Sequence, residues 1–312
     1  MMFDFKTNLG QAQFENPIFT ASGCAGSGKE LSQFFELSEL GAIVTKSIML
    51  KARSGRATPR MAETPSGMLN SIGLQGPGID QFLELDIPWL RQQSATIVVS
   101  IAGESVEDYA VLARKLRSVS GISALEVNIS CPNVENRGQV FACQPATARA
   151  AIEAVRRNIG GELPIIAKLT PDVTSIADIA EEVVAAGADA IALINTVLGM
   201  VIDTNSMRPK LAGKTGGLSG PAIRPIAVRA IYQVHERLPH VKILGMGGVS
   251  SGRDAFELIL AGASAVSVGT ATFGNPTAAI KIKEELREEL ISHGFDSLRE
   301  AVGYAHREEA RS

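Results

Sequence analysis

One cysteine, Cys131, lies in the stretch Asn-Ile-Ser-Cys-Pro-Asn (128–133), where an apolar run ends in a polar turn. An isolated loop cysteine usually has no function, but here Pro132 fixes the turn and Asn128 and Asn133 flank the thiol. A thiol has a pKa of about 8.5 and suits a base that removes a weakly acidic carbon-bound proton at mildly alkaline pH. We therefore predict that Cys131 is a catalytic base.

Nucleophilic catalysis by a Cys–His pair is the alternative role for this cysteine. The four histidines lie on a predicted helix, on the turn after it and in the C-terminal tail, at His235, His240, His293 and His306. None of them ends a predicted strand, so such a pair is not favoured, and the histidines are expected at the surface. Cys143 and Cys24 are expected to be structural; because Cys24 follows a strand end, a place in the pocket lining is the less favoured alternative for it.

Eight short apolar, β-rich runs must position these residues. They span residues 17–23, 41–47, 96–103, 124–132, 164–171, 190–196, 241–249 and 265–271. Amphipathic helices are predicted between them, among others at 106–119, 147–159, 176–187 and 252–262. Eight strand–helix units within about 250 residues predict a single α/β domain over 1–312, a (β/α)8 TIM barrel, and a doubly wound sheet is the alternative.

Two segments, 48–76 and 197–220, are too long to be tight loops. Long insertions in a compact domain are usually functional, so both are predicted at the C-terminal face of the barrel. From about residue 293 the chain is a polar tail that is expected to form a peripheral helix.

Polar residues end most of the apolar runs, and a barrel places such residues around its active site. They are Ser22, Lys46, Ser47, Ser100, Asn128, Lys168, Asn195 and Thr196. Burying a lysine without a partner is costly, so Lys46 and Lys168 should each face an anionic or acceptor group.

The last two strand ends predict a phosphate site. Gly247-Gly248 and Gly269-Thr270 follow strands seven and eight, where barrels often bind phosphate on backbone N–H groups. Gly216-Gly217 and Ser219-Gly220 can complete this cradle from the second insertion. Together with Lys168, the cradle indicates a phosphorylated cofactor with an electron-accepting ring. FMN fits better than a dinucleotide, because no G-x-G-x-x-G follows a first strand.

Composition narrows the possible partners and the compartment. The chain has 312 residues, a net charge of −3 and no apolar run that approaches the ~18 residues of a membrane span, so neither nucleic acid nor a membrane is expected as partner. The three cysteines form no C-x-x-C pair, and the start lacks a secretory apolar region. We expect a cytoplasmic protein without a metal site or an iron–sulfur cluster of its own.

Seven segments together resemble the class 1 dihydroorotate dehydrogenases of pyrimidine biosynthesis, over most of the chain. They are PRMAETPSGMLNSIGLQGPG (59–78), LEVNISCPNV (125–134), AKLTPDVT (167–174), INTVLGM (194–200), KTGGLSGPA (214–222), GMGGV (245–249) and GASAVSVGTA (262–271). The forms AETPSGMLNSIGLQ and KTGGLSGPAI are similar to the NAD-linked 1B catalytic subunit. Because the first strand begins by residue 17, the membrane-linked class with its N-terminal helical extension is excluded.

The resemblance implies an FMN-containing barrel, with one FMN per chain, that oxidises (S)-dihydroorotate to orotate. Cys131 would take the C5 proton, the C6 hydride would pass to flavin N5, and Lys46 would lie at the flavin–substrate junction as a second catalytic residue. The implied substrate-binding residues are Lys46, Asn70, Ser71, Ile72, Gly73, Leu74, Asn128, Asn133, Asn195 and Thr196. The implied FMN-binding residues are Ser22, Lys46, Ser47, Ser100, Asn128, Lys168, Ile194, Gly220, Gly247, Gly248, Gly269 and Thr270.

One residue departs from the family pattern. Where the family usually carries an asparagine as a flavin contact, this chain carries Ser100, a shorter side chain that donates directly or through a water.

The resemblance also implies a partner. NAD-linked members work with an electron-transfer subunit that carries FAD and a [2Fe–2S] cluster, and they form a homodimer core within a heterotetramer. This chain has neither a dinucleotide fingerprint nor enough cysteines for such a cluster. We therefore expect dihydroorotate to reduce the isolated chain, which should then pass electrons poorly to NAD+.

Two other functions are weighed against this one. A dihydropyrimidine (uracil/thymine) dehydrogenase-like catalytic barrel shares the Cys-Pro turn, but the stretch NSIGLQ (70–75) is expected to receive a carboxylate, which favours dihydroorotate over uracil. A cofactor-free sugar-phosphate barrel keeps the glycine cradle and leaves Lys46, Lys168 and Cys131 unexplained.

Overall fold

A computed structural model describes residues 3–130, 144–161 and 163–307. Its main sheet has eight strands in the order β3-β16-β15-β10-β9-β8-β7-β4. Their bounds are β3 Ile18–Thr20, β4 Ile43–Val44, β7 Ile97–Ile101, β8 Ile122–Asn128, β9 Ile165–Lys168, β10 Ala190–Leu193, β15 Lys242–Met246 and β16 Ala265–Val268. Every neighbouring pair is parallel. A bridge from Phe19 to Ala42 closes the barrel between β3 and β4, so all eight predicted strands are confirmed.

Alternation along each strand fills the barrel interior with apolar side chains. One set of alternate residues forms a separate buried cluster that includes Val44, Val98, Ala124, Ile166 and Ala265. The hairpin of β1 (Thr7–Leu9) and β2 (Ala12–Phe14) joins this cluster through Leu9 and Phe14. Because side chains alternate with a period of two, residues two positions further along each strand project into the interior nearer its C-terminal end.

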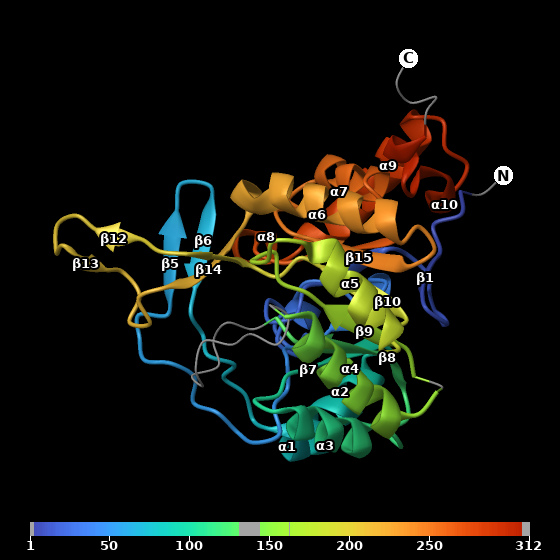
Figure 1. Cartoon of the computed structure of the whole chain (residues 1–312). Coiled ribbons are helices and arrows are strands. Elements are labelled where there is room, and N and C mark those ends of the chain that lie inside the picture. Colours follow the sequence, from blue (N-terminus) through green and yellow to red (C-terminus); the bar gives the residue numbers. More distant parts are fainter. Residues whose placement is uncertain (1–2, 131–143, 162, 308–312) are drawn as a thin grey trace.

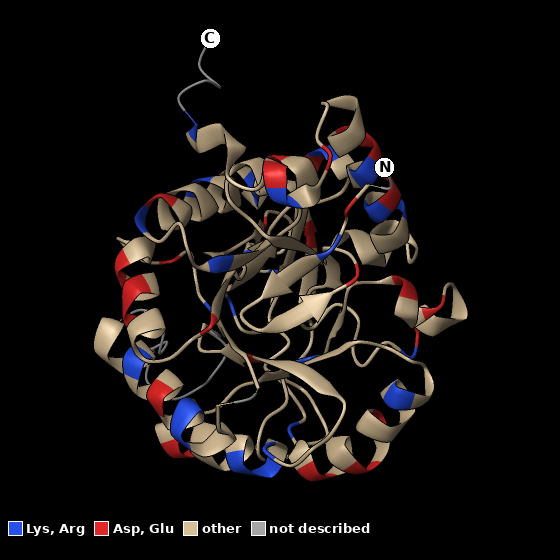
Figure 2. Ribbon diagram, turned by 90° about the vertical axis from the view of Figure 1, so that its right-hand side faces the viewer, with Lys and Arg blue, Asp and Glu red and all other residues tan. Residues whose placement is uncertain are grey.

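Helices form an outer ring around the strands, with charged residues of both signs distributed along them (Figure 2). The longer ones are α3 Val106–Leu116, α4 Pro145–Ile159, α5 Ile176–Ala185, α6 Arg224–Arg237, α7 Gly252–Leu260 and α9 Ala278–Ser292. Ser105, Ser175 and Ser251 cap α3, α5 and α7 by accepting a bond from the N–H three residues on. The four helices predicted from the sequence are confirmed.

The connection from β3 to β4 differs from the regular strand–helix pattern. Residues 21–42 hold two short 3₁₀ turns, η1 (Leu31–Gln33) and η2 (Leu37–Glu39), instead of an α-helix. The stretch Ala-Ser-Gly-Cys-Ala-Gly-Ser-Gly (21–28) is too rich in glycine and serine to continue a helix. Before β7 the chain forms α1 (Ile79–Gln81), the π-helical η3 (Phe82–Asp86) and α2 (Ile87–Gln92).

The two long insertions join into one antiparallel sheet in the order β11-β14-β6-β5. The first insertion contributes β5 (Met61–Thr64) and β6 (Gly67–Asn70), and the second contributes β11 (Val197–Gly199) and β14 (Gly216–Ser219). A small hairpin of β12 (Ile202–Asp203) and β13 (Arg208–Pro209) extends beyond it and projects from the barrel with β5 and β6 (Figure 1).

The C-terminal segment packs more closely than a polar tail would. It holds the short helices α10 (Leu298–Ala301) and η6 (Tyr304–His306), and Leu298 and Ala301 are buried. The expectation that all histidines lie on the surface is wrong for His235, which is half-buried because Gly262 and Gly303 pack directly against its ring. None of the helices within 3–130, 144–161 and 163–307 is both long and apolar enough to span a bilayer.

Candidate active site

A cavity of about 550 Å³ opens at the C-terminal ends of the barrel strands, beneath the inserted sheet. Strand alternation determines which side chains reach it. Lys168 follows the interior residue Ile166 by two positions, and Ser267 follows Ala265 in the same way. Such cavities, mostly apolar with a few convergent polar groups, are the usual binding sites of enzymes.

Most of the residues predicted for the site line this one cavity. They are Ser22, Lys46, Ser47, Asn70, Ile72, Gly73, Leu74, Asn128, Lys168, Ile194, Asn195, Thr196, Gly220, Gly247, Gly248, Gly269 and Thr270. Ser71 and Ser100 lie behind the lining, and both are buried. Cys131, Asn133 and Cys143 lie outside the described residues.

Three serine hydroxyls form a compact cluster at the wall of the cavity. Ser22 Oγ lies 3.1 Å from Ser47 Oγ and 3.2 Å from Ser100 Oγ, and the Ser47–Ser100 distance is 2.9 Å. Ser100 donates in turn to Glu126 Oε1 at 2.8 Å. Ser22 and Ser47 face the cavity, and Ser100 lies behind them and links them to a buried carboxylate.

A second chain of bonds fixes the polar side chains at the ends of β8 and β10. Asn128 Nδ2 donates to Ser47 Oγ at 2.9 Å, and its Oδ1 accepts from Ser130 Oγ at 2.8 Å. Asn195 Nδ2 donates to Ser130 Oγ at 2.7 Å, and the Thr196 N–H donates to Asn195 Oδ1 at 2.8 Å. The residue that immediately precedes Cys131 is thus held by two asparagines.

Two lysines supply the positive charge of the cavity. Lys168 is buried, and its Nζ lies 3.7 Å from Glu126 Oε1. Lys46 is half-buried on the neighbouring part of the lining. An ammonium group in such a place favours an anionic or electron-accepting ligand.

The glycine loops after β15 and β16 form a concave backbone surface at one end of the cavity. Gly248 has a φ of +76°, and a Cβ there would lie 2.7 Å from Arg224 Cβ and 3.0 Å from the Gly220 carbonyl oxygen. Only glycine therefore fits between this loop and the second insertion.

Asp254, near the start of α7, holds the next part of this loop in place. It accepts bonds from the Ser250 N–H at 2.9 Å and Ser250 Oγ at 2.7 Å, and it pairs with Arg224. Burial raises the pKa of the Asp254 carboxyl, but the bonds from Ser250, the charge of Arg224 and a bond from Ser251 outweigh it and lower that pKa.

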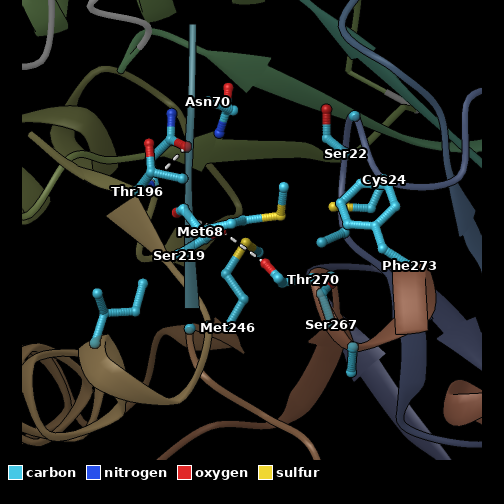
Figure 3. Close-up of a pocket in the computed structure, with 18 of the residues that line it drawn as sticks. Ser22, Cys24, Met68, Asn70, Thr196, Ser219, Met246, Ser267, Thr270 and Phe273 are labelled. Carbon is cyan, nitrogen blue, oxygen red and sulfur yellow. Dashed lines mark hydrogen bonds between the residues drawn. The ribbon is translucent and has the colours of Figure 1, made fainter. Parts of the chain in front are cut away.

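Several lining residues were missed by the sequence analysis. Met68, Met246 and Phe273 supply apolar walls, and the Met68 and Met246 side chains extend into the cavity (Figure 3). Ser267 is buried in the lining, and its hydroxyl has no hydrogen-bond partner among the described residues. Strand alternation from Ala265 was the signal that could have identified Ser267, and alternation from Leu244 could have identified Met246.

Cys24 also lines the cavity, although it was expected to be structural. Burial raises the pKa of its thiol, and the positive charges of Lys168 and Lys46 oppose this rise only partly. Cys24 is therefore largely a neutral thiol near neutral pH, and a neutral thiol is a poor base.

Comparisons with known proteins identify the family of this chain. The family model described as dihydroorotate dehydrogenase matches residues 4–290. A relative from Desulforamulus reducens, named dihydroorotate dehydrogenase B (NAD(+)), catalytic subunit, is 46% identical over 98% of this chain and 100% of its own. Relatives with the same name are 48% identical in Desulforudis audaxviator, over 94% of each chain, and 45% identical in Bacillus pumilus, over 95% of this chain and 94% of the relative. The chain belongs to the dihydroorotate dehydrogenase family.

Proposed function

We propose that this chain is the catalytic subunit of an NAD-linked dihydroorotate dehydrogenase, which oxidises (S)-dihydroorotate to orotate with one bound FMN. The observation that carries the proposal is a cavity with buried Lys168 beside a hydroxyl cluster and a glycine-lined backbone surface at one end. This combination suits a ligand with an electron-accepting ring and a phosphate.

The cofactor is assigned to the deeper part of the cavity. Family membership implies a flavin, and the glycine cradle argues for FMN because backbone N–H groups bind phosphate well. The phosphate is assigned to the loops at Gly220, Gly247-Gly248 and Gly269-Thr270. The ring is assigned to Ser22, Lys46, Ser47, Asn128, Lys168 and Ile194, with Ser100 supporting them from behind.

The Ser267 hydroxyl, which has no hydrogen-bond partner in the described part of the chain, supports a polar ligand in this position. A buried hydroxyl without a partner is costly, and a ribityl chain or phosphate within the cavity would satisfy it. When bound, FMN supplies the acceptor for the hydride from substrate C6.

The substrate is assigned to the mouth of the cavity, below the inserted sheet. The stretch Asn70, Ser71, Ile72, Gly73 and Leu74 would receive the carboxylate, and Asn128, Asn133, Asn195 and Thr196 would bind the amide edges of the ring. Ser71 supports this turn from behind, since Arg56 Nη1 donates to its hydroxyl at 3.0 Å.

Cys131 is proposed as the base that takes the proton from C5. The hydride leaves from C6, the other carbon of the C5–C6 bond. The electron pair of the C5–H bond then forms the C5=C6 double bond of orotate, so the substrate loses one proton and one hydride. Ser130, held by Asn128 and Asn195, supports this role because it fixes the backbone that leads into Cys131. Lys46, on the cavity lining, is proposed to hold the substrate against the ring.

A partner subunit is proposed to carry the electrons onward. The relatives' name, catalytic subunit, implies a second subunit, and we specify one with FAD and a [2Fe–2S] cluster in a heterotetramer around a homodimer. Exposed apolar side chains on the inserted strands and their hairpin support docking of other chains there; they are Met61, Leu198, Met200, Ile202 and Met207. The odd number of cysteines, with no C-x-x-C pair in the sequence, supports a reducing, cytoplasmic location.

The test is anaerobic mixing of the purified chain with dihydroorotate, followed by the flavin absorbance. We expect rapid bleaching in the wild type and bleaching slower by at least about 100-fold in Cys131→Ser, because a positioned base contributes 10²–10⁴-fold. Cys143→Ser is the matched control and should bleach like the wild type.

Other outcomes separate the alternatives. Bleaching of a yellow protein by dihydrouracil but not by dihydroorotate would favour the dihydropyrimidine dehydrogenase-like barrel. A colourless protein that takes up no FMN would favour the sugar-phosphate barrel.

A further inference from the structure

Glu126 is a buried carboxylate below the cavity that the proposed chemistry does not use. It lies on β8, two residues before Asn128, and its side chain is 0% exposed. Oε1 accepts the Ser100 hydroxyl at 2.8 Å and lies 3.7 Å from Lys168 Nζ. No described residue donates a hydrogen bond to Oε2. A charge buried in the middle of a strand is costly unless it is paired and hydrogen-bonded.

The Glu126–Lys168 pair places a negative charge directly behind the cation of the site. Both side chains are buried, so solvent screens their interaction weakly. Lys168 lines the cavity and Glu126 lies behind it. Glu126 therefore partly offsets the positive charge that Lys168 presents to a ligand.

Glu126 also imposes a direction on the serine cluster. A carboxylate only accepts hydrogen bonds, so the Ser100 proton must point to Glu126, and Ser22 must donate to Ser100. Ser47 accepts from Asn128, and its own proton stays within the cluster. Ser22 and Ser47 thus keep their protons within the cluster, and only their oxygen lone pairs are left to accept a ring N–H in the cavity.

We propose that Glu126 is a positioning residue that sets the electron affinity of the bound cofactor, through the charge of Lys168 and the orientation of the Ser22, Ser47 and Ser100 hydroxyls. This inference rests on the proposed flavin function. Removing the carboxylate leaves the Lys168 ammonium uncompensated, and a cation next to the ring favours the electron-rich reduced cofactor over the oxidised one.

The experiment compares Glu126→Gln with the wild type, with the exposed Glu107→Gln on α3 as matched control. The midpoint potential of bound FMN is measured, together with the dissociation constants of oxidised and reduced FMN. We expect Glu126→Gln to raise the ratio of the dissociation constant of oxidised FMN to that of reduced FMN about tenfold. For a two-electron couple this makes the midpoint potential about 30 mV more positive. Glu126→Asp keeps the charge and should stay closer to the wild type than Glu126→Gln. An unchanged potential in Glu126→Gln would overturn the inference.

A second measurement covers the case in which Glu126→Gln does not fold. Lys168→Met leaves Glu126 buried without its cation and should lower the unfolding midpoint in denaturant, whereas Lys168→Met/Glu126→Leu should recover part of the loss. A double variant less stable than Lys168→Met would overturn the pairing. A wild type that takes up no FMN removes the proposed function and this inference with it. If dihydroorotate bleaches the wild type but the midpoint potential of Glu126→Gln is unchanged, the proposed function stands and only the role of Glu126 is removed.

Discussion

Thr196 and Gly217 touch so closely that a Cβ on Gly217 would lie 2.0 Å from Thr196 Oγ1. Thr196 follows barrel strand β10, whereas Gly217 lies on β14 of the second insertion. Gly217 is also paired with Asn70 of the first insertion, whose Nδ2 donates to the Gly217 carbonyl at 3.4 Å. One glycine therefore connects the barrel to both insertions at the mouth of the cavity.

Gly217→Ala should impair substrate binding while leaving the cofactor in place. The added methyl must displace Thr196 or β14, and a shift of about 1 Å in a positioned group can cost about 100-fold in catalysis. We expect at least a tenfold rise in KM for dihydroorotate, measured by steady-state kinetics, with an unchanged ratio of FMN to protein. Gly161→Ala is the control, because its Cβ would meet nothing within 4 Å. Unaltered kinetics in Gly217→Ala would show that this contact does not position the site.

The sequence predicted the barrel well because its signal is local. Each of the eight strands is a short apolar run buried on both faces, and this pattern needs no knowledge of the rest of the chain. The inserted sheet was not predicted, because its strands are short and β6 pairs with β14 about 150 residues away in the sequence.

The same distinction applies to the site. The residues that end strands, such as Lys168 and Asn128, could be identified from the chain alone. For Ser100 the sequence left open a direct or a water-mediated contact with the cofactor. Its neighbours Ser47 and Glu126, behind the lining, are brought to it only by the barrel. Roles assigned to Cys131 and Asn133 remain predictions.

Gly248→Ala should weaken FMN binding. The backbone at Gly248 has a φ of +76°, which costs an L-residue roughly 1–2 kcal/mol, and the methyl would press on Arg224 and on the Gly220 carbonyl. We expect at least a tenfold rise in the FMN dissociation constant, measured by fluorescence titration of the apoprotein. Gly274→Ala also alters the cavity lining, but its Cβ would meet nothing within 4 Å, so it should bind FMN like the wild type. Equal affinities in the two variants would argue against the cradle.

Cys24 should react slowly with iodoacetamide at pH 7 and faster as the pH rises. Burial raises the pKa of its thiol, so the reactive thiolate is scarce near neutrality. Because Cys24 lines the cavity, bound FMN should slow its alkylation further, at least fivefold, as followed by peptide mass spectrometry. Alkylation at the same rate with and without FMN would show that the cofactor does not cover this part of the cavity.

His235 should make the stability of the fold depend on pH. Burial lowers the pKa of its imidazole, and the nearby charges of His306 and Lys242 act in the same direction. Its ring lies 4.8 Å from that of His306, which stacks on Tyr232, and its Nδ1 has no hydrogen-bond partner within the described ranges. The folded state therefore keeps His235 neutral at a pH where the unfolded chain already binds a proton.

The sign of the effect follows from this difference in proton binding. Above the unfolded pKa of about 6.5 the full stability is present, and it is lost as the pH falls through that value toward the lower folded pKa. We expect the free energy of unfolding, measured in urea, to fall between pH 7 and pH 5, with a shallower slope in His235→Phe. The exposed His240→Phe serves as control and should keep the wild-type slope. If His235→Phe instead runs parallel to the wild type over this range, His235 does not carry the pH dependence.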